Sequence, residues 1–226
     1  MTKRPRLLDL YCGAGGAATG YNRAGFDVTG IDLSPQPQFP FEFHQFDALN
    51  FLDTGLWALF DIIHASPPCQ FFTQMSARDK GKGGVADSHV DLLTPTLARL
   101  RQIPAPWVVE NVMGARRIGG HALLLHGGMF GLRVHRPRLF WSNMLLMQPT
   151  ARKSPEIVGV YGKRPDGRRL WGNCPTSTLR AAKGLEDAQD AMGMDWADWH
   201  GTKEAIPPAY TTFIGEQLLQ HLEAVA

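Results

Sequence analysis

The sequence has 226 residues, of which 44% are hydrophobic and 19% are charged, and its formal net charge is +2. These values exclude a largely disordered chain, and no apolar run reaches the roughly 18 residues that a membrane span requires. We therefore expect a soluble, cytoplasmic protein of one domain, or of one domain with a small appendage. The three cysteines lie far apart, so neither a disulfide framework nor a zinc site is expected.

The charge is distributed unevenly along the chain. Residues 99–140 contain seven arginines and one glutamate, and residues 151–170 contain six cations and two acids. From residue 183 onward there are two lysines and eight acids. A basic middle beside an acidic end indicates a one-sided field that suits a polyanion. The excess of arginine over lysine favours this interpretation over a mixed solvated surface, because guanidinium groups suit phosphates and bases.

The first half of the chain alternates strand and helix patterns. Strands are predicted at 6–12, 26–33, 41–47, 60–66 and 107–112. One helix follows the first strand and ends near Gly25, and another covers 87–101 with Asp87 or Ser88 as its cap. This alternation predicts an α/β fold, a mostly parallel sheet with helices on both faces. The remaining chain is expected to hold strands at 126–132 and 138–142, an irregular stretch at 149–178 and a final helix at 209–224.

A glycine-rich turn follows the first predicted strand. The run Gly13-Ala14-Gly15-Gly16-Ala17-Ala18 satisfies G-x-G-x-x-G/A, and Asp32 lies at the end of the next strand. Glycines let the backbone approach a ligand, the turn supplies free N–H groups, and a carboxylate at that place can bind ribose hydroxyls. The pattern indicates a nucleoside-bearing cofactor without separating NAD from S-adenosylmethionine. A tight turn without a ligand is the alternative.

Three further groups are candidates for chemistry. Cys69 follows two prolines after the fourth predicted strand, at the edge where open α/β sheets place their ligands. That placement favours a nucleophile over a small buried hydrophobe. Glu110 lies at the end of an apolar strand, as either a buried acid with a raised pKa or a structural residue. Arg136 and Arg138 share one face at the start of a strand, and their alternative is an ordinary edge strand with exposed cations.

The motifs together resemble a known family. The chain resembles the DNA cytosine-5 methyltransferases in an ordered set of motifs: DLYCGAGG (9–16), SPPCQ (66–70), ENV (110–112) and RPRLF (136–140). Residues 185–196 are similar to the penultimate motif of the family and residues 204–208 to its last one, so the resemblance covers about residues 6–222. It implies a Rossmann-like, S-adenosylmethionine-dependent methyltransferase fold with a very small target-recognition segment.

The resemblance implies a cofactor site. S-adenosylmethionine would be the methyl donor and S-adenosylhomocysteine the product. The glycine turn would hold the methionine part, Asp32 the ribose and Asp47 the adenine amino group. The full set of residues expected at the cofactor is Tyr11, Gly13, Ala14, Gly15, Gly16, Asp32, Leu33, Asp47, Ala48, Pro67, Glu204 and Ala205.

The resemblance also implies catalytic roles. Cys69 would attack C6 of a cytosine flipped out of the duplex, which makes C5 able to take the methyl group. Glu110 would hold or protonate N3 and contact the amino group. Arg138, supported by Arg136, would bind the base carbonyl and help to hold Cys69 as a thiolate. The sequence assigns no residue to removal of the C5 proton.

The implied substrate is double-stranded DNA, bound by a monomer in a bacterial or phage-infected cell. The residues expected to contact DNA are Gln70, Arg78, Lys80, Lys82, Lys163, Arg164, Arg168 and Arg169. We divide the chain into a catalytic, cofactor-binding core (1–146), a reduced target-recognition segment (147–178) and a segment closing back onto the core (179–226). We expect no metal site and no membrane attachment, and the sequence does not specify a partner nuclease.

The sequence departs from the family pattern at two places. Lys203 and Glu204 stand where the family usually has Gly-Asn, and Val134 stands where a glutamine is usual. Three alternatives remain open: the same chemistry on RNA cytosine, which the small recognition segment favours, a catalytically idle DNA-binding relative, and an NAD-dependent protein. The intact Cys69, Glu110 and Arg138 argue against an idle relative, and NAD binding leaves the PPCQ and ENV motifs unexplained.

Overall fold

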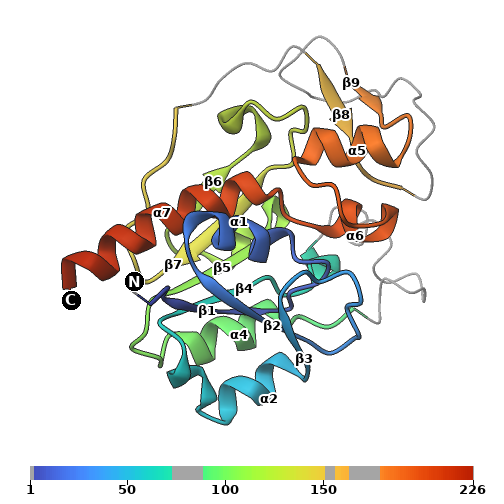
Figure 1. Cartoon of the computed structure of the whole chain (residues 1–226). Coiled ribbons are helices and arrows are strands. Elements are labelled where there is room, and N and C mark those ends of the chain that lie inside the picture. The colour runs from blue at the N-terminus through green and yellow to red at the C-terminus, as the bar shows by residue number, and fades with distance from the viewer. Residues whose placement is uncertain (1–2, 73–88, 151–155, 163–178, 226) are drawn as a thin grey trace.

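The computed structural model describes residues 3–72, 89–150, 156–162 and 179–225. Its centre is a sheet of seven strands in the order β3-β2-β1-β4-β5-β7-β6 (Figure 1). The strands are β1 (Arg6–Leu10), β2 (Asp27–Asp32), β3 (Glu42–Gln45), β4 (Ile62–Ala65), β5 (Trp107–Val112), β6 (Leu123–Leu125) and β7 (Arg138–Ser142). The first five pair in parallel, whereas β7 is antiparallel to β5 and to β6. The predicted Rossmann-like α/β fold is confirmed.

Helices cover both faces of this sheet (Figure 1). On one face lie α1 (Gly16–Ala24) and α7 (Pro208–Val225), and on the other α2 (Ala48–Asp53) and α4 (Leu93–Leu100). Because successive side chains of a strand point to opposite faces, Leu7 packs under α1 and α7 while Leu8 packs under α2 and α4. Apolar strands buried on both faces follow from this arrangement.

The first and last helices are in close contact. A Cβ atom on Gly20 of α1 would lie 1.9 Å from the Thr211 hydroxyl oxygen and 2.2 Å from the Pro208 carbonyl oxygen of α7. The Thr211 hydroxyl donates to the Ala17 carbonyl at 2.9 Å. Glycine at position 20 therefore lets the two helices approach, and α7 holds α1 against the sheet.

A second, smaller unit lies beside the main sheet (Figure 1). It consists of the parallel pair β8 (Ile157–Gly159) and β9 (Leu179–Ala181) with the helices α5 (Leu185–Met192) and α6 (Trp199–Glu204). Small apolar side chains fill its core, among them Val158, Val160, Ala188 and Ala191. The expectation that 149–178 is irregular is wrong at β8, because a three-residue strand is too short to show an alternating pattern.

Two other predicted elements differ in the structure. The strand expected at 126–132 is the 3₁₀ helix η5 (Gly127–Phe130), and the strand of this region is β6, earlier in the chain. A Cβ atom on Gly127 would lie 1.8 Å from the Val134 carbonyl oxygen. The backbone at Gly127 therefore packs closely against residue 134 instead of pairing as part of a β-strand. The helix expected at 87–101 begins only at Leu93, and Asp91 rather than Asp87 or Ser88 accepts the Thr94 N–H, at 3.0 Å. Residues 87–88 lie outside the described ranges.

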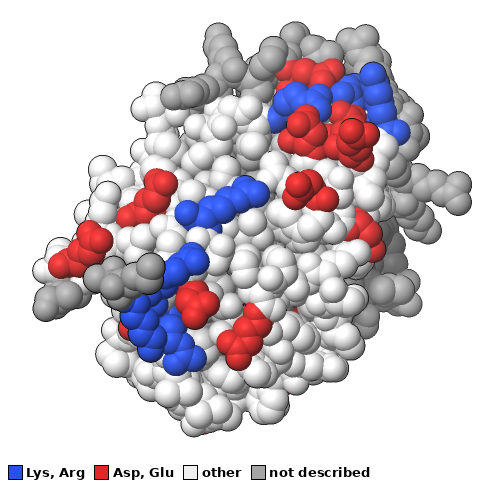
Figure 2. Space-filling view, in the orientation of Figure 1, with Lys and Arg blue, Asp and Glu red and all other residues white. Residues whose placement is uncertain are grey.

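Part of the basic middle of the sequence is neutralised or withdrawn from solvent, whereas Arg101, Arg116 and Arg117 are exposed. Arg99 pairs with Asp53 at 2.7 Å, Arg133 lies among acids, and Arg136 and Arg138 are partly or wholly withdrawn from solvent. On the face shown in Figure 2, cationic and acidic side chains lie next to one another. The count of arginines therefore overstates the available positive charge. No helix in the described part of the chain is long and apolar enough to cross a membrane.

Candidate active site

The candidate catalytic side chains meet at one edge of the sheet. β4 leads into the loop that carries Cys69, β5 carries Glu110 near its end, and the antiparallel β7 begins with Arg138. In the β5–β7 ladder Glu110 faces Phe140 and Val112 faces Arg138, so Glu110 and Arg138 are diagonal neighbours on the same face. The motifs thus lie together because the parallel strands β4 and β5 end where the antiparallel strand β7 begins.

Glu110 and Arg138 form a buried ion pair. The Arg138 Nε lies 2.8 Å from the Glu110 Oε1, and their side chains are 15% and 8% exposed. Burial raises the pKa of Glu110, and the charges of Arg138 and Arg136 oppose that rise. The net shift is upward, so Glu110 takes up a proton more readily than an ordinary glutamate.

Cys69 lies in the same electrostatic environment. Burial raises the pKa of its thiol, and the Glu110 charge raises it further, while Arg138 acts in the opposite direction. The Arg138 charge acts in the direction that the expected role requires, but burial and the carboxylate are opposed to it and the net shift is upward. The expectation that Arg138 helps to hold Cys69 as a thiolate stays a prediction. Loss of the Glu110 charge on protonation would remove one cause of the upward shift.

Hydrogen bonds and packing fix the loop around Cys69. The Asn111 side-chain amide donates to the Pro67 carbonyl at 2.9 Å, and the Phe72 N–H donates to the Cys69 carbonyl at 2.9 Å. The Arg117 guanidinium lies over the Phe72 ring, 5.0 Å from its centroid. Gln70, in the 3₁₀ helix η2 (Gln70–Phe72), is exposed. The backbone of the loop is therefore tied to β5 and to the residues that follow it.

Arg136 supports the site through the backbone. Its guanidinium donates to the carbonyls of Lys203 and Val160, and its own carbonyl accepts the Tyr210 hydroxyl at 2.9 Å. Burial lowers the pKa of Arg136 to about 10, and the Arg138 charge adds to that effect. Its φ of 36° is unusual for a residue with a side chain. These contacts give Arg136 a supporting place between α6 and the start of β7.

The glycine turn brings left-handed backbone to the ends of β1 and β2. Tyr11, Gly13 and Gly15 have φ values of 58°, 50° and 84°. A Cβ atom on Gly13 would meet nothing within 4 Å, so the turn borders open space there. The Gly13 N–H donates to Asp32 at 3.1 Å, while the Tyr11 hydroxyl is 2.9 Å from the Thr96 hydroxyl on α4. The turn is thus fixed by one hydrogen bond to the end of β2 and by one to α4.

The chemistry of the adjacent strand ends fits an adenosyl group. Asp32 accepts backbone N–H groups with both carboxylate oxygens, and the side chain of Leu33 beside it is 66% exposed. Asp47 caps α2 by accepting the Asn50 N–H at 2.8 Å, and Ala48 is buried behind it. A carboxylate can accept hydrogen bonds from ribose hydroxyls, and an exposed apolar side chain beside it can pack against a flat base.

The last motif closes against the same turn. A Cβ atom on Gly16 would lie 2.4 Å from the Ile206 carbonyl oxygen and 2.9 Å from the Ala205 Cβ. The Trp196 indole N–H donates to the Ala14 carbonyl at 2.8 Å. Glu204, half exposed, is one of the charges that raise the pKa of Cys69. The segment 204–206 therefore lies between the glycine turn and the catalytic side chains.

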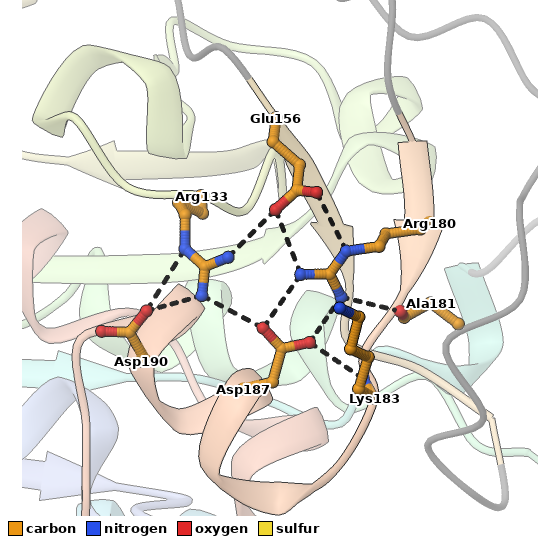
Figure 3. Close-up of polar contacts among 7 residues, drawn as sticks. All are labelled: Arg133, Glu156, Arg180, Ala181, Lys183, Asp187 and Asp190. Carbon is orange, nitrogen blue, oxygen red and sulfur yellow. Dashed lines mark hydrogen bonds and ion pairs between the residues drawn. The ribbon is translucent and has the colours of Figure 1, made fainter.

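A separate ion-pair cluster lies in the smaller unit (Figure 3). Arg133 contacts Glu156, Asp187 and Asp190 at 3.0, 3.1 and 2.6 Å, and Arg180 contacts Glu156 at 3.0 Å as well as Asp187. The side-chain hydrogen bonds to Asp187 and Glu156 raise the pKa of Arg180. The cluster joins β8, β9 and α5, the elements before and after the undescribed stretch of this region.

Several expected DNA contacts cannot be placed. The residues Arg78, Lys80, Lys82, Lys163, Arg164, Arg168 and Arg169 lie outside the described residues. Sequence reasoning missed the buried His64, whose imidazole bonds to Tyr21 and Ser66, because nothing in the pattern distinguishes it from an apolar strand residue. It also missed Asn111 as an anchor of the Cys69 loop.

Comparisons with known proteins agree with this geometry. Type II methyltransferase M.HgiGI of Herpetosiphon aurantiacus is 32% identical over 123 residues, which are 49% of this chain and 93% of that protein. A putative DNA modification methyltransferase from an Escherichia coli prophage superposes with a TM-score of 0.61 at 14% identity, covering 97% of this chain and 99% of the other. The Schizosaccharomyces pombe Dnmt2 methyltransferase superposes with a TM-score of 0.59 at 15% identity, covering 97% and 99%. No family model matches the sequence.

Proposed function

The chain belongs to the C5-methyltransferase family, and on that premise we propose that it methylates C5 of cytosine in DNA through a covalent bond between Cys69 and C6. The observation that carries the proposal is the buried Glu110–Arg138 pair, 2.8 Å apart, whose charges act on Cys69. A nucleophile, an acid and a cation within one water-poor edge of the sheet suit covalent attack on an aromatic base.

S-adenosylmethionine is the proposed methyl donor. Its sulfonium supplies an electrophilic methyl group when it is bound. Asp32 and Asp47 would bind the ribose and the adenine amino group, with Leu33 against the ring. Gly13 leaves room for its methionine part, while Gly15 lets the turn pack against Pro40 and Phe39, and residues 204–206 close the turn from the other side. The proposed roles of Pro67 and Glu204 at the cofactor rest on the family pattern.

Glu110 and Cys69 are coupled in the proposed mechanism. Glu110 holds a proton toward N3 of the extruded base, which draws electrons from the ring and makes C6 open to attack. The same proton cancels the carboxylate charge that raises the pKa of Cys69, so the thiol ionises more easily when the base is held. Arg138 then has no carboxylate to neutralise and can bind the carbonyl oxygen of the base.

DNA is proposed as the substrate because the prophage protein on which the chain superposes is a putative DNA modification methyltransferase, and because the sequence relative M.HgiGI is a type II methyltransferase. The expected DNA contacts of the undescribed segments, and the division of the chain at residues 147 and 178, stay proposals. The fold brings Cys69, Glu110 and Arg138 together at one edge of the sheet. This grouping argues against a catalytically inactive DNA-binding relative. An RNA substrate is tested as a separate arm of the experiment below.

The test is covalent capture of the target base. Wild type, S-adenosylmethionine and duplex DNA with 5-fluorocytosine in place of cytosine should give a denaturation-resistant adduct, because fluorine at C5 cannot leave as a proton. Cys69→Ala should form no adduct and transfer no methyl group, while its affinity for S-adenosylhomocysteine stays within about twofold of wild type. An adduct with fluorocytosine RNA alone would move the substrate to RNA. Turnover by Cys69→Ala would refute the nucleophile.

A further inference from the structure

A hydrogen-bonded chain of three side chains crosses the apolar core between the cofactor side and the catalytic side. The Tyr21 hydroxyl oxygen on α1 lies 2.9 Å from Nδ1 of His64 on β4. Nε2 of His64 lies 2.8 Å from the hydroxyl oxygen of Ser66. Tyr21 and His64 are both fully buried, and their rings are 5.1 Å apart between centroids. The hydroxyl of Tyr21 and the imidazole of His64 thus find their partners within the core, and the chain ends at the partly exposed Ser66.

The imidazole of this chain is neutral. Burial lowers the pKa of His64 to about 3. The titratable group on the neighbouring strand is Asp9, the register partner of His64, and burial raises the pKa of its carboxyl well above the usual range. A neutral imidazole donates with one nitrogen and accepts with the other, so it can bond both hydroxyls at once. Each imidazole nitrogen therefore has one hydroxyl partner.

The two ends of the chain lie on elements with different roles. Tyr21 is on the helix that the glycine turn opens, and Ser66 directly precedes Pro67, Pro68 and Cys69. The Ser66 N–H donates to the Leu10 carbonyl at 3.1 Å, so its backbone is held by β1 while its side chain is held by His64. A displacement of either end would be passed to the other through two hydrogen bonds.

Core stability alone does not call for this chain. Replacing buried hydrogen-bonded groups by apolar groups of the same shape is often nearly neutral for the free energy of unfolding. A directional polar link specifies one arrangement of its ends, which apolar packing does less sharply. The link joins the helix at the methyl donor to the loop of the nucleophile, and the distance between these two must be right for transfer.

We propose that His64 is a positioning residue, which through Tyr21 and Ser66 sets the place of the Cys69 loop relative to the cofactor-binding helix. The inference rests on the proposed function, because it requires that S-adenosylmethionine binds at the glycine turn and that Cys69 is the nucleophile. None of the three side chains is placed in contact with substrate.

A double-mutant cycle tests the link at its two ends. Tyr21→Phe and Ser66→Ala each remove one hydroxyl and little volume, and the two hydroxyls are joined only through His64. Each single variant should slow adduct formation on fluorocytosine duplex DNA by about tenfold or more, since small misplacements of reacting groups have effects of this size. Affinity for S-adenosylhomocysteine should change less than about threefold. The double variant should be no slower than the slower single one.

Controls separate positioning from loss of a buried hydroxyl. Thr29→Val removes a hydroxyl that donates to Glu42 at 3.1 Å in the other half of the sheet and should leave the rate unchanged. Ser66→Thr keeps the hydroxyl and should stay within about threefold of wild type. Folding of every variant is checked by thermal unfolding.

The outcomes are distinct. Independent, multiplicative slowing by Tyr21→Phe and Ser66→Ala, or unchanged rates in both, would overturn the positioning role while leaving the proposed function intact. Variants that slow only in proportion to their loss of folded protein would also overturn it. If wild type itself formed no adduct, the proposed function would fall, and this inference with it.

Discussion

Arg133 and Arg138 are five residues apart in the sequence, yet they lie in opposite electrostatic settings. Arg138 is 15% exposed, pairs with the single buried carboxylate of Glu110, and its charge lowers the pKa of Cys69. Arg133 is 34% exposed and lies among three carboxylates in the cluster of Figure 3. A guanidinium that has to act on a substrate needs binding capacity left over, whereas one that joins elements is saturated by its neighbours.

The difference also appears in the perturbed groups. At the catalytic edge, desolvation is the largest cause and raises the pKa of both Glu110 and Cys69. In the cluster, hydrogen bonds to arginine are the largest cause, and they lower the pKa of Asp187 and of Glu156. Groups whose pKa is raised by burial are thus separated from groups whose charge is stabilised by ion pairs.

The largest effect is expected for Glu110→Gln. The amide keeps the shape of the side chain but cannot donate a proton as an acid, so the rate of methyl transfer should fall by about two to four orders of magnitude. Affinity for S-adenosylhomocysteine should not change. The matched control is Glu156→Gln in the cluster, which should keep the rate within about twofold. Equal losses in both variants would erase the contrast between the two regions.

A smaller effect is expected for Arg180→Met, measured as stability. This change leaves Glu156 and Asp187 with fewer partners, and the free energy of unfolding should fall by about 1–3 kcal/mol, between the values for exposed and buried pairs. Thermal unfolding should show a fall of several degrees at low salt. The fall should shrink in 1 M salt, where the Debye length is about 3 Å. Arg101→Met, on an exposed arginine, is the control, and an equal fall in Tm there would mean that the cluster adds nothing.

The smallest effect is expected for Glu204→Asn. The Glu204 charge is one cause of the raised pKa of Cys69, so its removal should shift the pH dependence of Cys69 alkylation to lower pH. The rate at neutral pH should rise by less than about tenfold, because Glu204 is half exposed and its charge is screened. Peptide mass spectrometry separates Cys69 from the other cysteines. A shift to higher pH would contradict the assigned sign.

The sequence predicted the central architecture because its central strands are mostly apolar segments that alternate with helical or turn patterns. β1, β4 and β5 appear near the expected places, and the meeting of Cys69 with Glu110 follows from their positions at strand ends. Arg138 could be placed with them only through the family resemblance. It is the first residue of β7, and it lies beside the ends of β4 and β5 because β7 runs antiparallel to β5. Sequence order alone does not say which way β7 runs.

The remaining features depend on contacts between distant residues. Nothing in the sequence pairs Arg133 with Asp190, so the basic middle was taken for a free surface when part of it is neutralised. The raised pKa of Cys69 depends on burial, which overrides the nearby arginine that suggested a thiolate. Tyr21 and His64 are 43 residues apart, and only the fold makes them neighbours.

The contact of the glycine turn and α1 with residues 204–212 has a consequence for synthesis on the ribosome. Gly16 touches Ile206, and Gly20 touches Thr211. The helix that opens at the cofactor turn is therefore translated long before the segment that covers it. At 5–20 residues per second, the interval between residue 24 and residue 208 is roughly 10–40 s. During that time the emerging polypeptide carries the glycine turn and α1 without the segment that packs against them, so the small residues of this face meet water or other protein surfaces before they meet α7.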